Sequence, residues 1–261
     1  MDKVEEILDN YYNNYDEDSR LIRDKSHMVE YITTTAYIEK HLKKGDRILE
    51  IGAGTGRYSI NYAEKGYKVD AVELINKNLE ILKSKITDKM DINAIKGNCI
   101  NLSMYEDNTF DITLVLGPLY HLYDEIDIKK AISEAVRVTK KNGKIFFAYI
   151  TDDSIMLSYG LRKGHIKELR EVCDENWNVK KIAEEIFATY KVDDFSKLME
   201  EYSVKKLATV GTDGISPNMQ DYINRLDDEE FEIYMDYHMK TCERKDLIGY
   251  STHILEIVEK I

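Results

Sequence analysis

The chain has 261 residues, enough for one large α/β domain with insertions or for two small domains. Hydrophobic residues make up 43% and charged residues 33%, with only 2 prolines, which excludes a disordered or fibrous protein. The 37 Lys and Arg residues are outnumbered by 49 Asp and Glu residues, and the net charge of -12 argues against DNA or an acidic membrane surface as a partner.

The N-terminal segment, MDKVEEILDN, is acidic and amphipathic, and it lacks the positive start and apolar run of a secretion signal. We therefore expect a cytoplasmic protein. No apolar stretch approaches the roughly 20 residues that span a bilayer, so no membrane partner is expected. The cysteines, Cys99, Cys173 and Cys242, are odd in number and far apart, which indicates neither a disulfide framework nor a metal site.

Helical periodicity predicts two helices ahead of the first strand, through Val4–Tyr15 and Met28–Leu42. Strands and helices then alternate, which is typical of parallel strands joined by helical crossovers on both faces of a sheet. The predicted strands are Arg47–Ile51, Val69–Glu73, Ile92–Lys96, Phe110–Leu116 and Lys144–Ile150, and the predicted helices between them are Arg57–Lys65, Asn76–Ser84 and Ile126–Thr139. Basic residues and a glycine, Lys140–Gly143, are expected to end the last of these helices.

The alternation stops after Ile150, where a charged stretch of mostly helical propensity follows that we interpret as an insertion. A helix Asp194–Tyr202, a strand Lys205–Val210, a second helical stretch and a last strand Thr252–Glu259 complete the chain. The predicted fold is a doubly wound, Rossmann-like α/β sheet of seven mostly parallel strands. We expect N-terminal helices in 1–45, a core in 46–151, 193–211 and 251–261, and helical insertions in 152–192 and 212–250.

The turn after the first strand carries glycines at alternate positions, Gly52, Gly54 and Gly56. Ligands of a doubly wound sheet sit beyond the carboxyl ends of the strands, and glycines there let a ligand approach the backbone closely. The dinucleotide fingerprint G-x-G-x-x-G does not fit, because Arg57 stands where its third glycine belongs. A P-loop is excluded as well, because no G-K-S/T follows.

The segment Glu50–Gly56, E-I-G-A-G-T-G, resembles motif I of the class I S-adenosylmethionine-dependent methyltransferases, E/D-x-G-x-G-x-G. The resemblance extends from Ile48 to Ile150. It implies S-adenosylmethionine as the cofactor, S-adenosylhomocysteine as the product, and a turn that packs against the methionine half and the adenosine. The cofactor-binding positions that it implies are Glu50, Gly52, Ala53, Gly54, Gly56, Tyr58, Glu73, Leu74, Asn98, Cys99, Leu116 and Gly117.

The resemblance implies a chemical role for two of these positions and for one longer segment. Glu73 ends the second strand, where a carboxylate can accept hydrogen bonds from both ribose hydroxyls, as an acid does in the family. Asn98 departs from the family's acid at the adenine amino group; its side-chain oxygen can accept the same bond, although asparagine is also a common turn residue. The segment Leu114–Leu122 resembles the post-strand motif of small-molecule methyltransferases, whose residues line the cofactor and form the floor of the acceptor pocket.

Methyl transfer from a sulfonium leaves a neutral leaving group, so alignment and exclusion of water supply most of the acceleration. An acceptor hydroxyl or ammonium also has to lose a proton. His121 is our catalytic candidate, because it follows the fourth strand on the ligand side and histidine changes charge near neutral pH. The same position also suits a histidine that only anchors the loop before the next helix.

The two insertions leave the sheet at its cofactor side, so we expect them to form a lid over an acceptor pocket together with the N-terminal helices. An enclosed pocket favours a small-molecule acceptor, methylated on O or N, over a polymer. An RNA or protein methyltransferase stays an alternative, although the lack of a basic stripe argues against RNA. A non-catalytic protein that binds S-adenosylmethionine would keep the same glycines and Glu73. These motifs specify neither the acceptor, its methylated atom, the oligomeric state nor the pathway.

Overall fold

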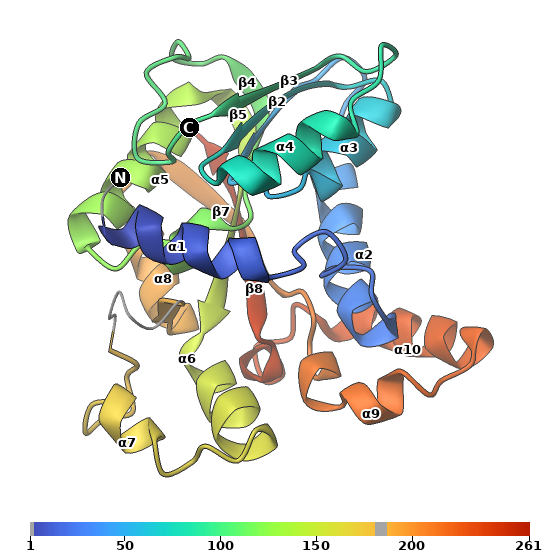
Figure 1. The fold of residues 1–261 in the computed structure, drawn as a ribbon, viewed down its shortest axis with the longest axis vertical. Coiled ribbons are helices and arrows are strands. Elements are labelled where there is room, and N and C mark those ends of the chain that lie inside the picture. Colours follow the sequence, from blue (N-terminus) through green and yellow to red (C-terminus); the bar gives the residue numbers. More distant parts are fainter. Residues whose placement is uncertain (1–2, 181–186) are drawn as a thin grey trace.

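The computed structural model describes residues 3–180 and 187–261. Residues 1–2 of the predicted N-terminal segment and 181–186 of the first predicted insertion lie outside the described residues. A central sheet has the strand order β3-β2-β1-β4-β5-β8-β7 (Figure 1). The strands are β1 (Arg47–Ile51), β2 (Lys68–Glu73), β3 (Ile92–Lys96), β4 (Phe110–Val115), β5 (Thr139–Thr151), β7 (Val204–Gly211) and β8 (His253–Lys260).

The direction of the strands confirms the predicted doubly wound α/β fold. The strands β3, β2, β1, β4 and β5 are parallel to one another, whereas β8 lies antiparallel between β5 and β7. The carboxyl ends of all the parallel strands and the amino end of β8 therefore meet at one edge of the sheet, where ligands of such folds bind. All seven predicted strands form. A short strand β6 (Thr189–Tyr190), which was not predicted, pairs with the end of β5.

Apolar residues of the strands pack against helices on both faces of the sheet. On one face, buried residues of α2 (Lys25–Glu39) and α3 (Arg57–Glu64) pack against β1, β5 and β8, and α4 (Asn76–Ser84) packs beside α3 through Leu82. On the other face, α5 (Glu125–Val138) and α8 (Val192–Met199) cover β4 and β5. The strands therefore carry apolar side chains on both faces, as is typical of a parallel sheet that helices cover on both sides.

The junction between α5 and β5 corrects one prediction. The basic run Lys140–Gly143 was expected to separate helix from strand, but β5 begins at Thr139, directly after the helix. The hydroxyl of Thr139 donates to the carbonyl of Ala135 at 2.6 Å, so this residue serves the helix end and the strand start together. The register of β4 with β5 shifts between Phe110 and Ile112, because residues 140–143 form a bulge in β5.

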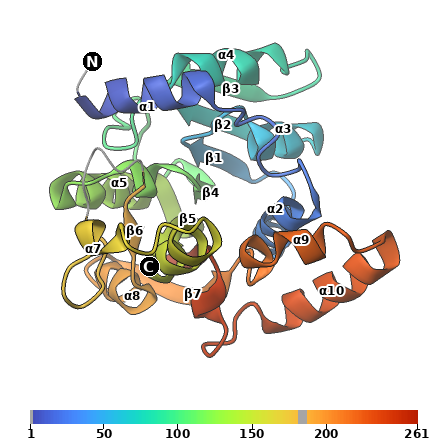
Figure 2. The ribbon, with the colours of Figure 1, turned by 60° about the horizontal axis from the view of Figure 1, so that its bottom comes forward.

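The segments between the closing strands lie beyond the carboxyl edge of the sheet (Figure 1). The first contains α6 (Asp152–Ser154), a π-helical segment η2 (Ile155–Arg162) and α7 (Leu169–Val172), and the second contains η3 (Ser216–Asn218), α9 (Gln220–Ile223), α10 (Asp228–Thr241) and η4 (Ile248–Tyr250). Figure 2 shows α9 and α10 beside α2, where Val29, Ile223 and Phe231 form a small apolar cluster. None of the helices in the described ranges has the length and apolar character needed to cross a membrane.

Candidate functional site

A cavity of about 240 Å³ lies at the carboxyl ends of β1, β2 and β4. It gathers nearly all the positions that the sequence predicted for the cofactor, together with the predicted catalytic histidine. The predicted residues that line it are Glu50, Gly52, Ala53, Gly54, Tyr58, Glu73, Leu74, Asn98, Cys99, Leu116, Gly117 and His121. Residues separated by as many as seventy positions thus converge because parallel strands end at the same edge.

The glycine turn is shaped by close contact with the segment that follows β4. Gly52 has φ of +70°, and a Cβ placed there would lie 2.7 Å from Cγ of Pro118. The amides of Gly52 and Ala53 both donate to the carbonyl of Val72, at 2.8 and 3.1 Å, which holds the turn against β2. A side chain at Gly52 would therefore push apart two walls of the cavity.

Gly56 does not line the cavity, unlike its predicted companions. Its φ is +85°, and an added Cβ would overlap Cδ1 of the fully buried Leu82 in α4. This glycine lets the start of α3 pack onto α4. The sequence could not separate this packing role from ligand contact, because both require a residue without a side chain.

Glu73 is 5% exposed, and its carboxylate joins two backbone segments of the cavity wall. Its Oε2 accepts from the Gly54 amide at 2.7 Å, and its Oε1 accepts from the Ile75 amide at 2.8 Å. An ionised carboxylate offers about four acceptor positions, so Glu73 keeps acceptor capacity for a ligand hydroxyl beside the two amides and the side chain of Asn78. Burial raises the pKa of Glu73, and the two amide bonds oppose that rise.

Glu50 lies at the end of β1, deeper in the same wall, and is 2% exposed. Its Oε2 accepts from the Ser59 amide at 2.8 Å and from the Ser59 hydroxyl. Burial raises the pKa of Glu50 to about 8, although the bonds from Ser59 oppose the rise. The side chain is therefore mostly protonated at neutral pH.

This raised pKa predicts a specific dependence of stability on pH. The folded state keeps a proton on Glu50 up to about pH 8, whereas the unfolded state releases it near the ordinary value of 4.5. The contribution of Glu50 to the free energy of unfolding is thus lost as the pH rises between these values, by at most about 1.4 kcal/mol per pH unit. We expect Glu50→Gln to abolish this loss, measured by urea unfolding from pH 5 to pH 8.

The matched control is Glu64→Gln, at an exposed glutamate of α3. This variant should keep the pH dependence of the wild type. Parallel curves for the wild type and Glu50→Gln would show that Glu50 has an ordinary pKa in the folded protein.

Asn98 holds the turn after β3. Its Oδ1 accepts from the Ile100 amide at 3.2 Å and lies 3.5 Å from Sγ of Cys99. The turn role considered from the sequence is thus present. An amide oxygen has two lone pairs, so the predicted bond to the adenine amino group would replace the weak one from the Cys99 thiol.

His121 ends the short helix η1 (Pro118–His121) and is buried against aromatic rings. Its Nε2 lies 2.8 Å from the hydroxyl of Tyr12, and its ring centroid lies 5.4 Å from that of Phe187. The histidine lines the cavity, and its partner Tyr12 belongs to α1 (Lys3–Asn14). Its catalytic role stays a prediction.

The N-terminal segment supplies residues that the sequence did not single out. Tyr12, Glu17 and Arg20 line the first cavity and also a second cavity of about 410 Å³, and Tyr120 lines both as well. The guanidinium of Arg20 donates to Glu17 at 3.1 Å and to Glu30 of α2 at 3.0 Å. No local motif marks these side chains, because only the folding of α1 across the sheet edge brings them to the site.

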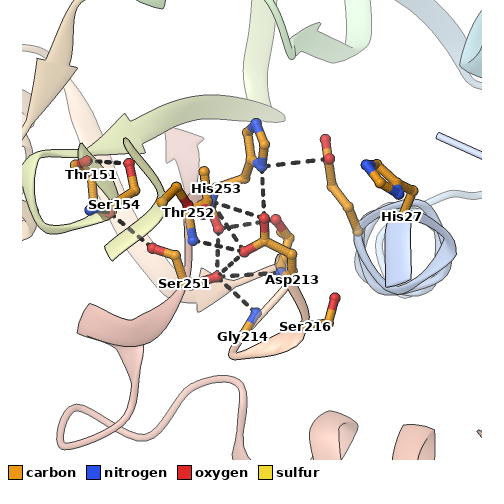
Figure 3. Close-up of polar contacts among 12 residues, drawn as sticks. His27, Thr151, Ser154, Asp213, Gly214, Ser216, Ser251, Thr252 and His253 are labelled. Atoms are coloured by element: carbon orange, nitrogen blue, oxygen red, sulfur yellow. Dashed lines mark hydrogen bonds and ion pairs between the residues drawn. The ribbon is translucent and has the colours of Figure 1, made fainter. Parts of the chain in front are cut away.

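The second cavity also contains a histidine held by two carboxylates (Figure 3). His253, the first residue of β8, has its Nδ1 2.7 Å from Oδ2 of Asp213 and 3.5 Å from Oε2 of Glu30. Asp213 is buried and also accepts from the Ser251 hydroxyl at 2.5 Å and the Thr252 amide at 2.9 Å. The spacing of the three groups could suit a metal ion. However, Arg20 already neutralises Glu30, so they form an ion-pair cluster here.

Comparison with known proteins agrees with this geometry. A family model described as a methyltransferase domain matches residues 49–147. A demethylmenaquinone methyltransferase of Paenarthrobacter aurescens is 34% identical over 107 residues, which are 41% of this chain and 40% of that protein. A cypemycin N-terminal methyltransferase of a Streptomyces species is 30% identical over 118 residues, 45% of this chain and 47% of that protein. The chain thus spans less than half the length of these curated relatives.

A solved structure, the PH0226 protein of Pyrococcus horikoshii, shares the fold over nearly the whole chain. Its TM-score is 0.62 at 17% identity, and the match covers 97% of this chain and 99% of that one. The family match, the motif I turn, Glu73 and the strand order together identify residues 49–147 as a methyltransferase domain of the class I, S-adenosylmethionine-dependent type.

Proposed function

We propose that the protein transfers a methyl group from S-adenosylmethionine to a small-molecule acceptor, on oxygen or nitrogen. The observation that carries this proposal is the pair of adjoining cavities. One matches the expected cofactor residues, and the other shares the side chains of Tyr12, Glu17, Arg20 and Tyr120 with it. A donor and an acceptor in these two spaces would meet at that shared wall.

The residues of the first cavity fit the cofactor. Glu73 keeps acceptor capacity for a ribose hydroxyl, and the turn with Gly52 and Gly54 lines the same cavity. Glu50 can ionise when a positive charge is placed nearby, because its pKa lies near 8. When bound, S-adenosylmethionine would supply an activated methyl group. The protein itself would then bind the cofactor and the acceptor, align them and exclude water.

The segments between the closing strands support an enclosed acceptor site. Tyr159, Arg162 and Phe187 from the first segment, and Pro217 and Gln220 from the second, line the second cavity. We propose that residues 152–192 and 212–250 act as a lid, with the N-terminal residues 1–45 closing the opposite side. A cavity of about 410 Å³ suits a small molecule better than a nucleic acid or a folded protein.

Methyl transfer from labelled S-adenosylmethionine tests the proposal. The purified protein is incubated with three separate acceptor fractions: small metabolites, RNA and protein. We expect label in the small-molecule fraction. Label in RNA or protein would favour those alternatives, and binding of S-adenosylmethionine without transfer to any fraction would favour a non-catalytic binding protein.

A further inference from the structure

We propose that the second cavity binds an aromatic hydroxyl compound and that His253 accepts the proton of that hydroxyl during methyl transfer. The inference rests on the proposed function. It names the acceptor class and a catalytic residue that neither the sequence motifs nor the comparisons suggest.

The hydrogen-bonding of His253 leaves one ring nitrogen for a ligand. Nδ1 contacts Asp213 and Glu30, which favours the tautomer with the proton on Nδ1 and a lone pair on Nε2. Figure 3 shows the other ring nitrogen on the side away from Asp213. No hydrogen bond joins Nε2 to any residue in the described ranges, and the side chain, 20% exposed, lines the cavity. Nε2 is thus positioned as a proton acceptor.

The charges around His253 adjust its basicity. Burial by itself would lower the pKa of His253, but the carboxylates of Glu30 and Asp213 outweigh it and raise the pKa above the ordinary 6.5. Arg20, between α1 and α2, opposes that rise. His27 of α2, which lines the same cavity and is paired with Asp24, adds a further ionisable group. The raised pKa of His253 lies closer to the pKa of a phenol, which is ordinarily about 10. Proton transfer from the phenol to His253 is therefore less unfavourable.

The cavity walls indicate an aromatic ligand. Tyr11 and Tyr15 stack at 5.2 Å, and Phe187 lies 6.1 Å from Tyr11 and 5.7 Å from Tyr120. All of these rings line the second cavity. Aromatic side chains pack well against a flat ring in offset or edge-to-face contacts.

Two cations of the cavity favour an ionised hydroxyl over an ammonium group. Arg162 donates to the neutral amide oxygen of Gln220 at 3.0 Å, and Lys163 makes no ion pair with any described residue. Within residues 3–180 and 187–261, no carboxylate forms an ion pair with either cation, in contrast to Arg20. On their side of the cavity these two charges favour an oxyanion over an ammonium group.

The proton and electron balance of the step is complete. The hydroxyl oxygen bonds to the methyl carbon as the bond from that carbon to sulfur breaks, and the bonding pair stays on sulfur. The hydroxyl proton passes to Nε2 of His253. His253 then returns the proton to water, so no oxidant or further reactant is required.

The test uses 4-nitrophenol, whose ionised form is yellow, with the protein saturated by S-adenosylhomocysteine. We expect the dye to bind the wild type and to ionise there at a lower pH than in His253→Asn, by about one pH unit or a tenfold change in ionised fraction. Asparagine keeps a donor for Asp213 but lacks Nε2. Asp213→Asn should also move ionisation to higher pH, because it removes a carboxylate that raises the pKa of His253.

The matched control is His165→Asn. His165 also has its Nδ1 2.7 Å from a carboxylate, that of Glu168, but it does not line the cavity. This variant should behave as the wild type. The proposal is overturned if the dye fails to bind, if it ionises alike in the wild type and His253→Asn, or if His27→Asn or His121→Asn abolishes the shift instead.

Binding of S-adenosylhomocysteine in the same samples separates this proposal from the proposed function. If S-adenosylhomocysteine binds and the dye does not ionise, only the proposed phenol acceptor and the role of His253 are contradicted. If S-adenosylhomocysteine itself does not bind the folded protein, the proposed function is contradicted.

Discussion

Replacing Glu73 with alanine is expected to weaken binding of S-adenosylmethionine and S-adenosylhomocysteine by about 100-fold, roughly 3 kcal/mol. The variant loses the acceptor for the ribose hydroxyls. It also frees the amides of Gly54 and Ile75, which the carboxylate holds at 2.7 and 2.8 Å. Isothermal titration calorimetry with both ligands measures the loss, and NAD serves as a ligand that the glycine spacing excludes.

Glu73→Gln separates the two roles of this side chain. Glutamine keeps the size and one acceptor oxygen, so a smaller loss of affinity is expected than with alanine. Glu64→Ala, at an exposed position of α3, should bind as the wild type does. Unchanged affinity in a folded Glu73→Ala protein would mean that the ribose is held elsewhere. Failure of the wild type to bind either sulfur ligand, or tighter binding of NAD, would contradict the cofactor assignment.

Replacing Gly56 with alanine is expected to lower the free energy of unfolding by about 2–4 kcal/mol. One part of this cost is backbone strain, because φ at Gly56 is +85° and an L-residue there is disfavoured. The larger part is overpacking, because the new methyl group would overlap the buried side chain of Leu82. Urea unfolding measures the change.

Gly66→Ala is a matched control for this prediction. Gly66 has the same φ of +85°, but no atom lies within 4 Å of the position that its Cβ would occupy. We expect this variant to lose about 1 kcal/mol, the backbone cost alone. The difference between the variants then measures the packing of α3 on α4. Equal losses would show that Leu82 moves aside without cost.

Local sequence patterns predicted much of the fold. The bounds of β1, β3 and α4 agree with the prediction, because each has a clear apolar period and a turn at both ends. Two predictions failed at places where pairing with other strands determines the secondary structure. Thr139 joined β5 through its pairing with Phe110 of β4, and Thr189–Tyr190 became a strand by pairing with the end of β5. A two-residue strand carries no period of its own.

The sequence by itself determined one wall of the first cavity, because motif I and Glu73 follow two consecutive parallel strands whose ends must meet. The tertiary structure alone decided the rest of the site. Tyr12 and Arg20 enter it because the N-terminal segment crosses the sheet edge, and the cluster of Glu30, Asp213 and His253 joins three distant parts of the chain. Such contacts form through long-range packing, and no local spacing of residues encodes them.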